Sequence, residues 1–324
     1  AGDAPGAAQA ILSLGGEVTG VGAKGTLLQA WLPPSSLLAL ANTREVAYIR
    51  RPATPVLLGN ERLGMATSEG LAVINAPAWH AAGYRGAGVK VAIVDGGFLN
   101  YPSLLGTELP ASVTIRNFVD GETNADVDGT TEHGTACAEI IHDIAPDATL
   151  YLVKVGTQLD LEEAVGWLIG QGVHIISTSL GWYNLSPGDG TGFFADLVNT
   201  ARTAGILWLT AASNDRENHW GGLWADDDGD GFLNLTSTQK VNYFVDAYGN
   251  PYAIPSGYQL MVFVRWDDWS AVDQDYDLHI LRWNGTEWDI IASSTEVQNG
   301  GFGQSPTEEA LVTTFGDATA YGFV

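Results

Sequence analysis

The central part of the chain alternates between short apolar runs and longer amphipathic segments. Four runs are apolar almost throughout: VKVAIVD (89–95), TLYLVKV (149–155), GVHIISTSL (172–180) and AGILWLTAAS (204–213). Such runs are typical of strands that are buried on both faces of a parallel sheet. Helical segments lie between them: GTACAEIIHDI (134–144), DLEEAVGWLIGQ (160–171) and FFADLVNTARTA (193–204). This order predicts an α/β domain with a mostly parallel sheet and flanking helices.

The two flanks of the chain follow other patterns. Near the N-terminus, EVTGV (17–21), TLLQAWL (26–32) and VAYIRR (46–51) predict strands, and two prolines and two serines start a helix over LLALAN (37–42). This is a small α+β unit. After residue 226, strand patterns follow one another without helices: 258–266, 276–283, 287–294, 309–316 and 320–324. They predict an antiparallel β-sandwich. We therefore expect three domains, at 1–57, 58–225 and 226–324.

Charge and composition narrow the range of partners. The chain has 38 acidic and 14 basic residues, a formal net charge of −24, which would repel nucleic acid and anionic membranes. No apolar run reaches the roughly 20 residues that a membrane span needs. Cys137 is the only cysteine, so no intramolecular disulfide can form. The start, AGDAPGAAQA, lacks the features of a secretory leader, so either the protein is cytosolic or a leader has been removed.

Three polar residues stand at strand ends or helix starts, where α/β proteins place their sites. Asp95 ends VAIVD, and a carboxylate there is well placed to hold an imidazole. His133 begins a helix, whose positive N-terminal end favours the neutral imidazole that accepts a proton. Gly134 beside it lets the backbone and a substrate approach closely. Asn214 follows another apolar run, and its amide can donate to a developing oxyanion.

These three motifs, in this order, resemble the subtilisin-like serine peptidases. VAIVDGGF is similar to the aspartate motif of that family, HGTAC to its histidine motif and AASN to the strand of its oxyanion asparagine. The resemblance implies that Asp95 orients His133, that His133 deprotonates a serine, and that Asn214 stabilises the tetrahedral intermediate. Ser179, Leu180 and Gly181 correspond to the strand that pairs with the substrate backbone. A polypeptide substrate, a secreted protein and catalysis without a cofactor are also implied.

The sequence departs from the family pattern at two places. Gly96 stands where the family usually has Thr or Ser. More seriously, no Gly-Thr-Ser, the context of the family's nucleophile, occurs in the chain. The serines after Asn214 lack that context: Ser237, Ser256, Ser270, Ser293, Ser294 and Ser305. Two interpretations remain open. The chain is a fragment of an endopeptidase, or it is a non-catalytic binding protein on a peptidase scaffold. A metal-dependent hydrolase is disfavoured, because histidines and carboxylates are not clustered.

The flanking units fit the same resemblance. Residues 33–51 are similar to the propeptides of these peptidases, which assist folding and inhibit the enzyme, so the N-terminal unit is an expected partner of the catalytic domain. The stretch VRWDDWSAVDQDYDLHIL (264–281) resembles the sandwich modules attached to secreted bacterial peptidases, which bind polymers or other proteins. The tryptophans of this unit either form a binding face or pack the core or its rim: Trp266, Trp269, Trp283 and Trp288.

One acidic loop follows the spacing of a calcium site. Asp226, Asp228, Asp230 and Asn234 match the first nine places of a calcium loop, but the twelfth place falls on Ser237 instead of a glutamate. The loop is therefore either a weak structural Ca²⁺ site or a solvated acidic turn. The remaining histidines lack the spacing of zinc ligands.

Overall fold

The computed structural model describes residues 4–57, 67–215, 218–246, 249–301 and 303–324. Contacts between residues divide the chain into two compact units. The first contains residues 1–182 and 190–216, and the second contains residues 183–189 and 217–324. The division into three domains at 1–57, 58–225 and 226–324 stays a prediction.

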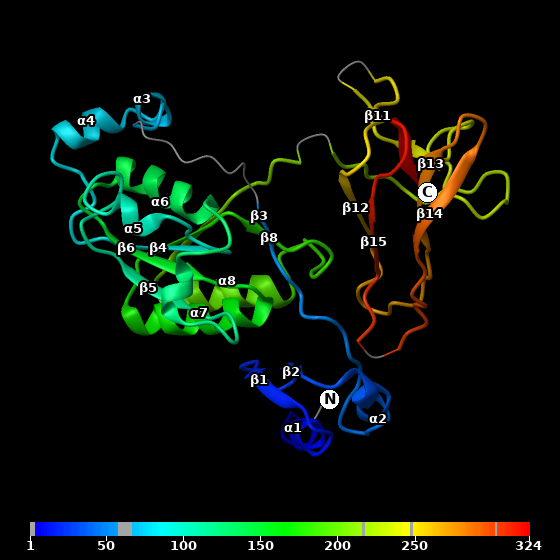
Figure 1. Cartoon of the computed structure of the whole chain (residues 1–324), viewed down its shortest axis with the longest axis horizontal. Coiled ribbons are helices and arrows are strands. Elements are labelled where there is room, and N and C mark those ends of the chain that lie inside the picture. Colours follow the sequence, from blue (N-terminus) through cyan, green and yellow to red (C-terminus); the bar gives the residue numbers. More distant parts are fainter. Residues whose placement is uncertain (1–3, 58–66, 216–217, 247–248, 302) are drawn as a thin grey trace. The chain divides into compact units, whose positions relative to one another are not determined.

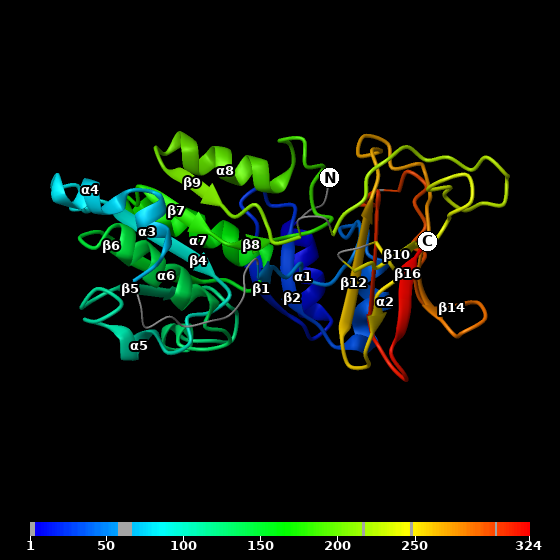
Figure 2. The same cartoon turned by 90° about the horizontal axis from the view of Figure 1, so that it is seen from above.

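A parallel five-stranded sheet forms the centre of the first unit. Its strands are β4 (Lys90–Asp95), β5 (Thr114–Asn117), β6 (Thr149–Lys154), β7 (Ile175–Thr178) and β9 (Leu207–Thr210). They lie in the order β5-β6-β4-β7-β9, and all four pairings are parallel (Figure 2). The predicted α/β class with a parallel sheet is confirmed. The central strand, β4, carries Asp95 at its carboxyl end.

Helices cover both faces of this sheet. Helix α6 (His133–Ile144) lies on one side, and α7 (Gln158–Gln171) and α8 (Phe193–Thr203) lie on the other (Figure 1). Alternate residues of β4 enter two different cores. Ala92 and Val94 pack with α7 and α8, whereas Val91 and Ile93 pack with α6. This explains why the β4 sequence is apolar without alternation.

Strand β9 differs from the expectation that all four apolar runs are buried. Trp208 packs against the core under α7 and α8, but Leu207 and Leu209 are 56% and 51% exposed. The reason is position: β9 is an edge strand of the described sheet, and its side chains alternate between the two faces. Only one of those faces is covered at this edge.

Short elements complete the first unit. They are α1 (Ala4–Ser13), β1 (Glu17–Val21), β2 (Leu28–Trp31), the 3₁₀ turn η1 (Pro34–Ser36), α2 (Leu37–Ala41), β3 (Val56–Leu57), α3 (Gly70–Val73), α4 (Ala76–Ala81), α5 (Tyr101–Leu104), η2 (Asn124–Val127) and β8 (Leu180–Gly181). The strand predicted at 46–51 is wrong: these residues pair with no strand in the described part of the chain. Tyr48 and Ile49 are both exposed, so the segment has no buried face to hold it in a sheet.

The N-terminal segment contacts α7 and the turn that follows β5. The Trp31 indole donates to Asp120 at 2.7 Å, and the Ala23 N–H donates to Glu162 at 3.3 Å. A Cβ atom at Gly20 would lie 2.6 Å from Leu159 of α7, so the absence of a side chain permits this close approach.

The second unit consists of antiparallel strands, as predicted. They are β10 (Asn242–Tyr243), β11 (Ala253–Ile254), β12 (Gln259–Arg265), β13 (Leu278–Trp283), β14 (Trp288–Ser294), β15 (Thr307–Thr313) and β16 (Thr319–Phe323). One sheet has the order β10-β16-β13-β14 with β11 beside β16, and the other pairs β12 with β15. Residues of both sheets, Val262, Leu278, Ile280 and Ala310, share one core. In the described residues, no helix of either unit is long and apolar enough to cross a membrane.

Candidate active site

Asp95 and His133 meet at the carboxyl edge of the central sheet. The Asp95 carboxylate has no exposed surface, and one of its oxygens accepts the Gly96 N–H at 2.8 Å. Its other oxygen lies 2.7 Å from Nδ1 of His133, which begins α6 and is 3% exposed. An ionised carboxylate only accepts hydrogen bonds, so Nδ1 carries the proton in this pair. The Nε2 atom of the neutral ring is then the basic nitrogen.

Two glycines allow this close approach of strand and helix. The Gly134 N–H donates to the Gly97 carbonyl oxygen at 3.2 Å. A Cβ atom at Gly134 would lie 2.5 Å from that oxygen and 2.8 Å from the Asp95 Cβ atom. At Gly97, a Cβ atom would lie 2.1 Å from the Gly129 carbonyl oxygen. Gly134 is thus required by the packing of the protein's own backbone around Asp95, in addition to any approach of a substrate.

Burial governs the ionisation of Asp95. Removal from water raises the pKa of this carboxyl above its ordinary value. The hydrogen bond and charge of His133, and the N–H groups of Gly96 and Gly97, oppose the rise. A buried carboxylate that is held by these donors stabilises positive charge on the ring beside it. The pair can therefore accept a proton at Nε2 and keep the resulting imidazolium stable.

Cys137 lies beside the pair, which the sequence reasoning missed. Its sulfur, an Asp95 oxygen and a His133 nitrogen all lie within 4.8 Å of one another. The thiol donates to the Ser179 hydroxyl at 3.8 Å. Burial, followed by the charge of Asp95, raises the pKa of Cys137 to about 11, so the thiol is protonated at neutral pH. The signal was present: residues four apart in a helix share a face, and Cys137 follows His133 by four.

The other predicted site residues follow the carboxyl ends of β7 and β9. Ser179 stands between β7 and β8, and β8 contains Leu180 and Gly181. Strand β8 pairs antiparallel with β3, with Val56 opposite Gly181 and Leu57 opposite Leu180. Asn214 is exposed and follows β9 by four residues, at the same edge of the sheet as Asp95, with β7 between the two strands.

The acidic loop of the second unit brings three of its four predicted ligands together. Carboxylate oxygens of Asp226, Asp228 and Asp230 lie within 4.8 Å of one another. The Lys240 ammonium pairs with Asp228 at 2.7 Å and also with Asp230. The Asn234 side-chain oxygen instead accepts the Asp227 N–H at 2.6 Å. These oxygens suit a calcium ion, but an ammonium already lies against two of the carboxylates.

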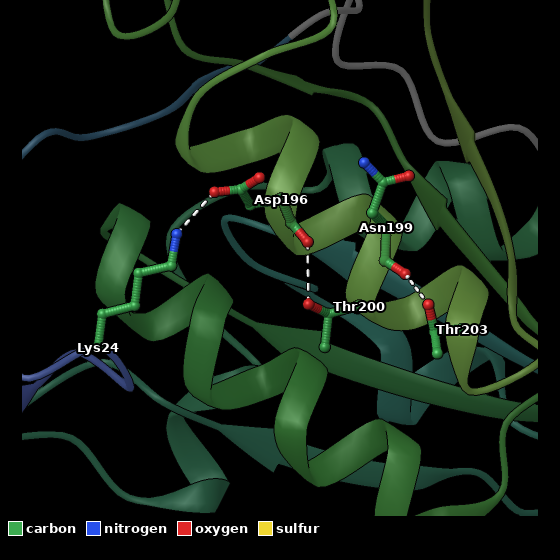
Figure 3. A pocket seen from close by; sticks show the side chains of 5 residues that line it. All are labelled: Lys24, Asp196, Asn199, Thr200 and Thr203. Carbon is green, nitrogen blue, oxygen red and sulfur yellow. Dashed lines mark hydrogen bonds and ion pairs between the residues drawn. The ribbon is translucent and has the colours of Figure 1, made fainter.

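A shallow pocket on the outer side of α8 is lined by Lys24, Asp196, Asn199, Thr200 and Thr203 (Figure 3). Lys24 pairs with Asp196 at 2.6 Å, and both side chains are largely exposed. The hydroxyls of Thr200 and Thr203 donate to carbonyl oxygens of the preceding turn of the helix. The pocket is therefore a contact between the N-terminal segment and α8, and no residue of the Asp95–His133 pair lines it.

The fold is that of an α/β protein with a buried pair of acid and imidazole at the carboxyl ends of its strands, and comparison with known proteins gives the family. The model of the subtilase family, peptidase S8, matches residues 86–264. The chain belongs to the subtilase family.

Individual relatives agree with this assignment. The chain is 30% identical to an alkaline protease of Alkalihalobacillus alcalophilus over 206 residues, which cover 58% of this chain and 49% of the relative. It is 35% identical to subtilisin E of Bacillus subtilis (strain 168) over 157 residues, 45% of this chain and 39% of the relative. The chain thus spans about half of the length, or less, of the curated relatives that it matches. Among solved structures, it is similar to the epidermin leader peptide processing serine protease of Staphylococcus aureus, with a TM-score of 0.46, 19% identity and coverage of 64% of this chain and 58% of that one.

Proposed function

We propose that this chain is part of a secreted serine endopeptidase of the subtilisin type. The observation that carries the proposal is the buried hydrogen bond of 2.7 Å between Asp95 and His133 at the carboxyl edge of the sheet. Structural ion pairs of this kind also occur elsewhere, but here the imidazole begins a helix and the pair lies in a chain of the subtilase family. Polypeptides are the substrates that this activity implies.

In this mechanism, Asp95 holds the His133 ring with its Nδ1 proton directed at the carboxylate. Nε2 takes the proton of a serine hydroxyl as the serine oxygen attacks the peptide carbonyl carbon. The imidazolium, stabilised by Asp95, then gives the proton to the leaving amine. The Asn214 amide donates to the oxyanion, and Ser179, Leu180 and Gly181 pair with the substrate backbone. No residue of this reaction requires a bound cofactor.

The serine is the component that these 324 residues do not supply in the family's Gly-Thr-Ser context. We propose that it belongs to a part of the protein outside this sequence. The N-terminal unit is the proposed internal inhibitor, supported by its contacts with α7 and α8. The β-sandwich is the proposed attachment module for a polymer or a protein ligand.

Labelling with a fluorophosphonate tests the activity. The product of the complete reading frame, folded and matured, should be labelled on a serine. Labelling should be lost in His133→Ala and strongly reduced in Asp95→Asn, because the hydroxyl is then no longer deprotonated. His142→Ala is the matched control, since it removes a histidine from the same helix and should leave labelling intact. A folded product that is not labelled would contradict the proposal and favour the non-catalytic binding protein.

We also propose that the acidic loop binds Ca²⁺ only in competition with Lys240. Asp226, Asp228 and Asp230 would hold the ion, which would stabilise the loop by replacing the ammonium. Lys240→Gln should therefore increase the affinity for Ca²⁺, measured by titration calorimetry, and Lys24→Gln is the control for loss of one positive charge elsewhere. Equal affinities in the two variants would show that Lys240 does not compete.

A further inference from the structure

The second unit has a cavity of about 390 Å³, and no residue of the Asp95–His133 site lines it. Its size is within the range of small-molecule sites, roughly 300–1,000 Å³. The lining combines two aromatic rings with three polar side chains, and it comes from the segment that leads into β10 and from the start of β14: Thr238, Gln239, Lys240, Val241, Tyr243 and Trp288. The proposed reaction uses none of these residues, so the cavity is a candidate for a second binding site.

Trp288 supplies a flat aromatic wall of this cavity. It lies opposite Trp283 of β13, and the two indoles pack edge to face with ring centroids 5.5 Å apart. Ile290 is two residues further along the strand, hence on the same face, and it is 58% exposed. This face is therefore the one that the core of the unit does not cover, and the half-buried Trp288 ring borders the cavity there.

The part of the wall that Val241 and Tyr243 form depends on a glycine in the neighbouring strand. Gly322 of β16 pairs with Tyr243. A Cβ atom at Gly322 would lie 2.6 Å from the Val241 Cγ1 atom and 2.7 Å from the Asn242 carbonyl oxygen. The absence of a side chain at Gly322 therefore permits residues 241–243 to lie close against β16, which brings Tyr243 into the same lining as Trp288.

The polar part of the lining can both donate and accept hydrogen bonds. The Gln239 amide nitrogen donates to the Val241 carbonyl oxygen at 3.1 Å, which fixes the side chain, and the amide also has an acceptor oxygen. Thr238 is exposed, and its hydroxyl can act in either role. The Lys240 ammonium has three donors, two of which are directed at carboxylates of the acidic loop. Its charge is thus paired within the unit, so the cavity has no excess of positive charge that would favour an anion.

A sugar ring matches this combination of groups. The axial C–H groups of a pyranose form an apolar face that packs on an aromatic ring, and the hydroxyls around its rim need both donors and acceptors. A purely apolar ligand would leave the polar side chains of the lining without partners. An anionic ligand would be repelled by the net charge of −24.

We propose that this cavity binds the pyranose rings of a neutral polysaccharide. The inference rests on the proposed role of the β-sandwich as an attachment module, and it names the ligand of that module. A fibrous protein is the other kind of polymer that the module could hold, and the experiments below distinguish the two.

Titration calorimetry of the 324-residue chain tests the site. The probes are hexamers of β-1,4-linked glucose and of β-1,4-linked N-acetylglucosamine, with a hexamer of galacturonate as the anionic control. At least one neutral hexamer should bind, and the anionic one should not. Trp288→Ala should weaken binding at least about tenfold because the flat wall is lost. Trp266→Ala, which removes a tryptophan of the same unit outside the lining, should keep the wild-type affinity. Binding of neither neutral hexamer, or equal affinities of Trp288→Ala and the wild type, would overturn the proposal.

A measurement on the wild-type chain does not depend on the folding of the alanine variant. The indole N–H signal of Trp288 in a nuclear magnetic resonance spectrum, assigned by its absence in Trp288→Phe, should shift when the bound hexamer is added. The corresponding signal of Trp266 should not shift. A hexamer that binds without moving the Trp288 signal would contradict the placement of the sugar in this cavity.

Co-sedimentation with insoluble polymers separates the sugar site from the attachment role. The polymers are cellulose, chitin and collagen fibres, and the protein is again the 324-residue chain. We expect retention on cellulose or chitin that Trp288→Ala reduces and Trp266→Ala does not. Retention that Trp288→Ala leaves unchanged, or retention on collagen alone, would preserve the attachment role and overturn the sugar site. Retention on none of the three polymers would overturn both.

Discussion

The positions of individual residues differ in how well they can be predicted from the sequence. Asp95 and His133 are foreseeable because a polar residue at the end of an apolar strand, or at the start of a helix, must lie at the sheet's edge. The role of Lys240 could not be predicted, since its contact with Asp228 and Asp230 depends on how a loop closes over 10 to 12 residues. Helical spacing alone would have placed Cys137 beside His133. The position of a residue within a strand or helix can thus be predicted from the neighbouring sequence, whereas a contact formed by the closure of a loop cannot.

The buried carboxyl of Asp95 should make stability depend on pH. A carboxyl with a raised pKa in the folded state holds more protons there than in the unfolded state, so stability falls as pH rises. The loss begins at the ordinary value of 3.8 and ends at the higher pKa of the folded protein. Urea unfolding at a series of pH values should show the wild type losing stability relative to Asp95→Asn above about pH 4. A difference that is constant, or that grows in favour of the wild type, would contradict this assignment.

Two glycines in helices should respond to alanine in opposite ways. Gly134→Ala should destabilise the first unit by on the order of 1–3 kcal/mol, because the new methyl group overlaps the Gly97 carbonyl oxygen. Gly166, in the exposed part of α7, has no atom within 4 Å of the position of a Cβ. Gly166→Ala should stabilise by about 0.5–1 kcal/mol through helix propensity. Thermal unfolding of both variants checks the pair, and two shifts of the same sign would show that space around Gly134 is not limiting.

At the scale of strands and helices, apolar runs predicted the buried elements well and the exposed ones poorly. The β4 and β6 runs are buried on both faces, as their lack of alternation indicates. The same pattern in β9 failed to show that this strand lies at an edge with one uncovered face. The segment 46–51 has strand propensity but no partner in the described residues. A sequence pattern indicates that a segment favours the strand conformation. Whether the segment forms a strand depends on a neighbouring strand that only the tertiary structure provides.

Glu308 in β15 shows what holds the second unit's strands together. It is 2% exposed, and its carboxylate accepts hydrogen bonds from the Ser294 hydroxyl, the Gln298 amide at 3.0 Å and the Glu296 N–H at 2.9 Å. Burial raises its pKa above the ordinary value. Glu308→Ala leaves buried donors without an acceptor, which should cost about 1–3 kcal/mol of stability for each such group.

Glu308→Gln is the control for this network. One amide oxygen can still accept from Gln298 and Glu296, and the amide nitrogen can donate to the Ser294 hydroxyl. We expect urea unfolding of the second unit to be affected much less than in the alanine variant. Equal losses in the two variants would mean that the charge of Glu308, and not its capacity to accept hydrogen bonds, stabilises the strands.

At the scale of the whole molecule, the sequence did not reveal that residues 183–189 belong to the second unit although both flanking segments belong to the first. Tyr183 stacks on Phe263 of β12 with ring centroids 4.8 Å apart, and the Asn184 amide donates to the Glu308 carbonyl oxygen at 3.0 Å. A boundary near residue 225 was the expectation from composition. The composition of the sequence changes only once, near residue 225, whereas two separate segments of the chain belong to the second unit.

Two compact units should unfold in two steps. We expect two transitions in differential scanning calorimetry, because each unit has its own core. Tyr183→Ala should lower the transition of the second unit, since loss of the ring contact removes about 0.5–1.5 kcal/mol beyond the area it buries. The transition of the first unit should stay unchanged, although residue 182 belongs to it. A shift of both transitions would show that the units unfold together.

The open edge at β9 has a consequence for how the molecule behaves in solution. In the described part of the sheet β9 pairs on one side only, and Leu207 and Leu209 lie exposed on one face of the sheet, so a second chain that covers this face would bury both leucines. The net charge of −24 opposes that encounter by repulsion between copies. Added salt screens the repulsion without weakening the apolar contact. We therefore expect copies of the protein to associate more as sodium chloride is added, so the intensity of scattered light should increase with salt concentration. Leu209→Lys should suppress this increase.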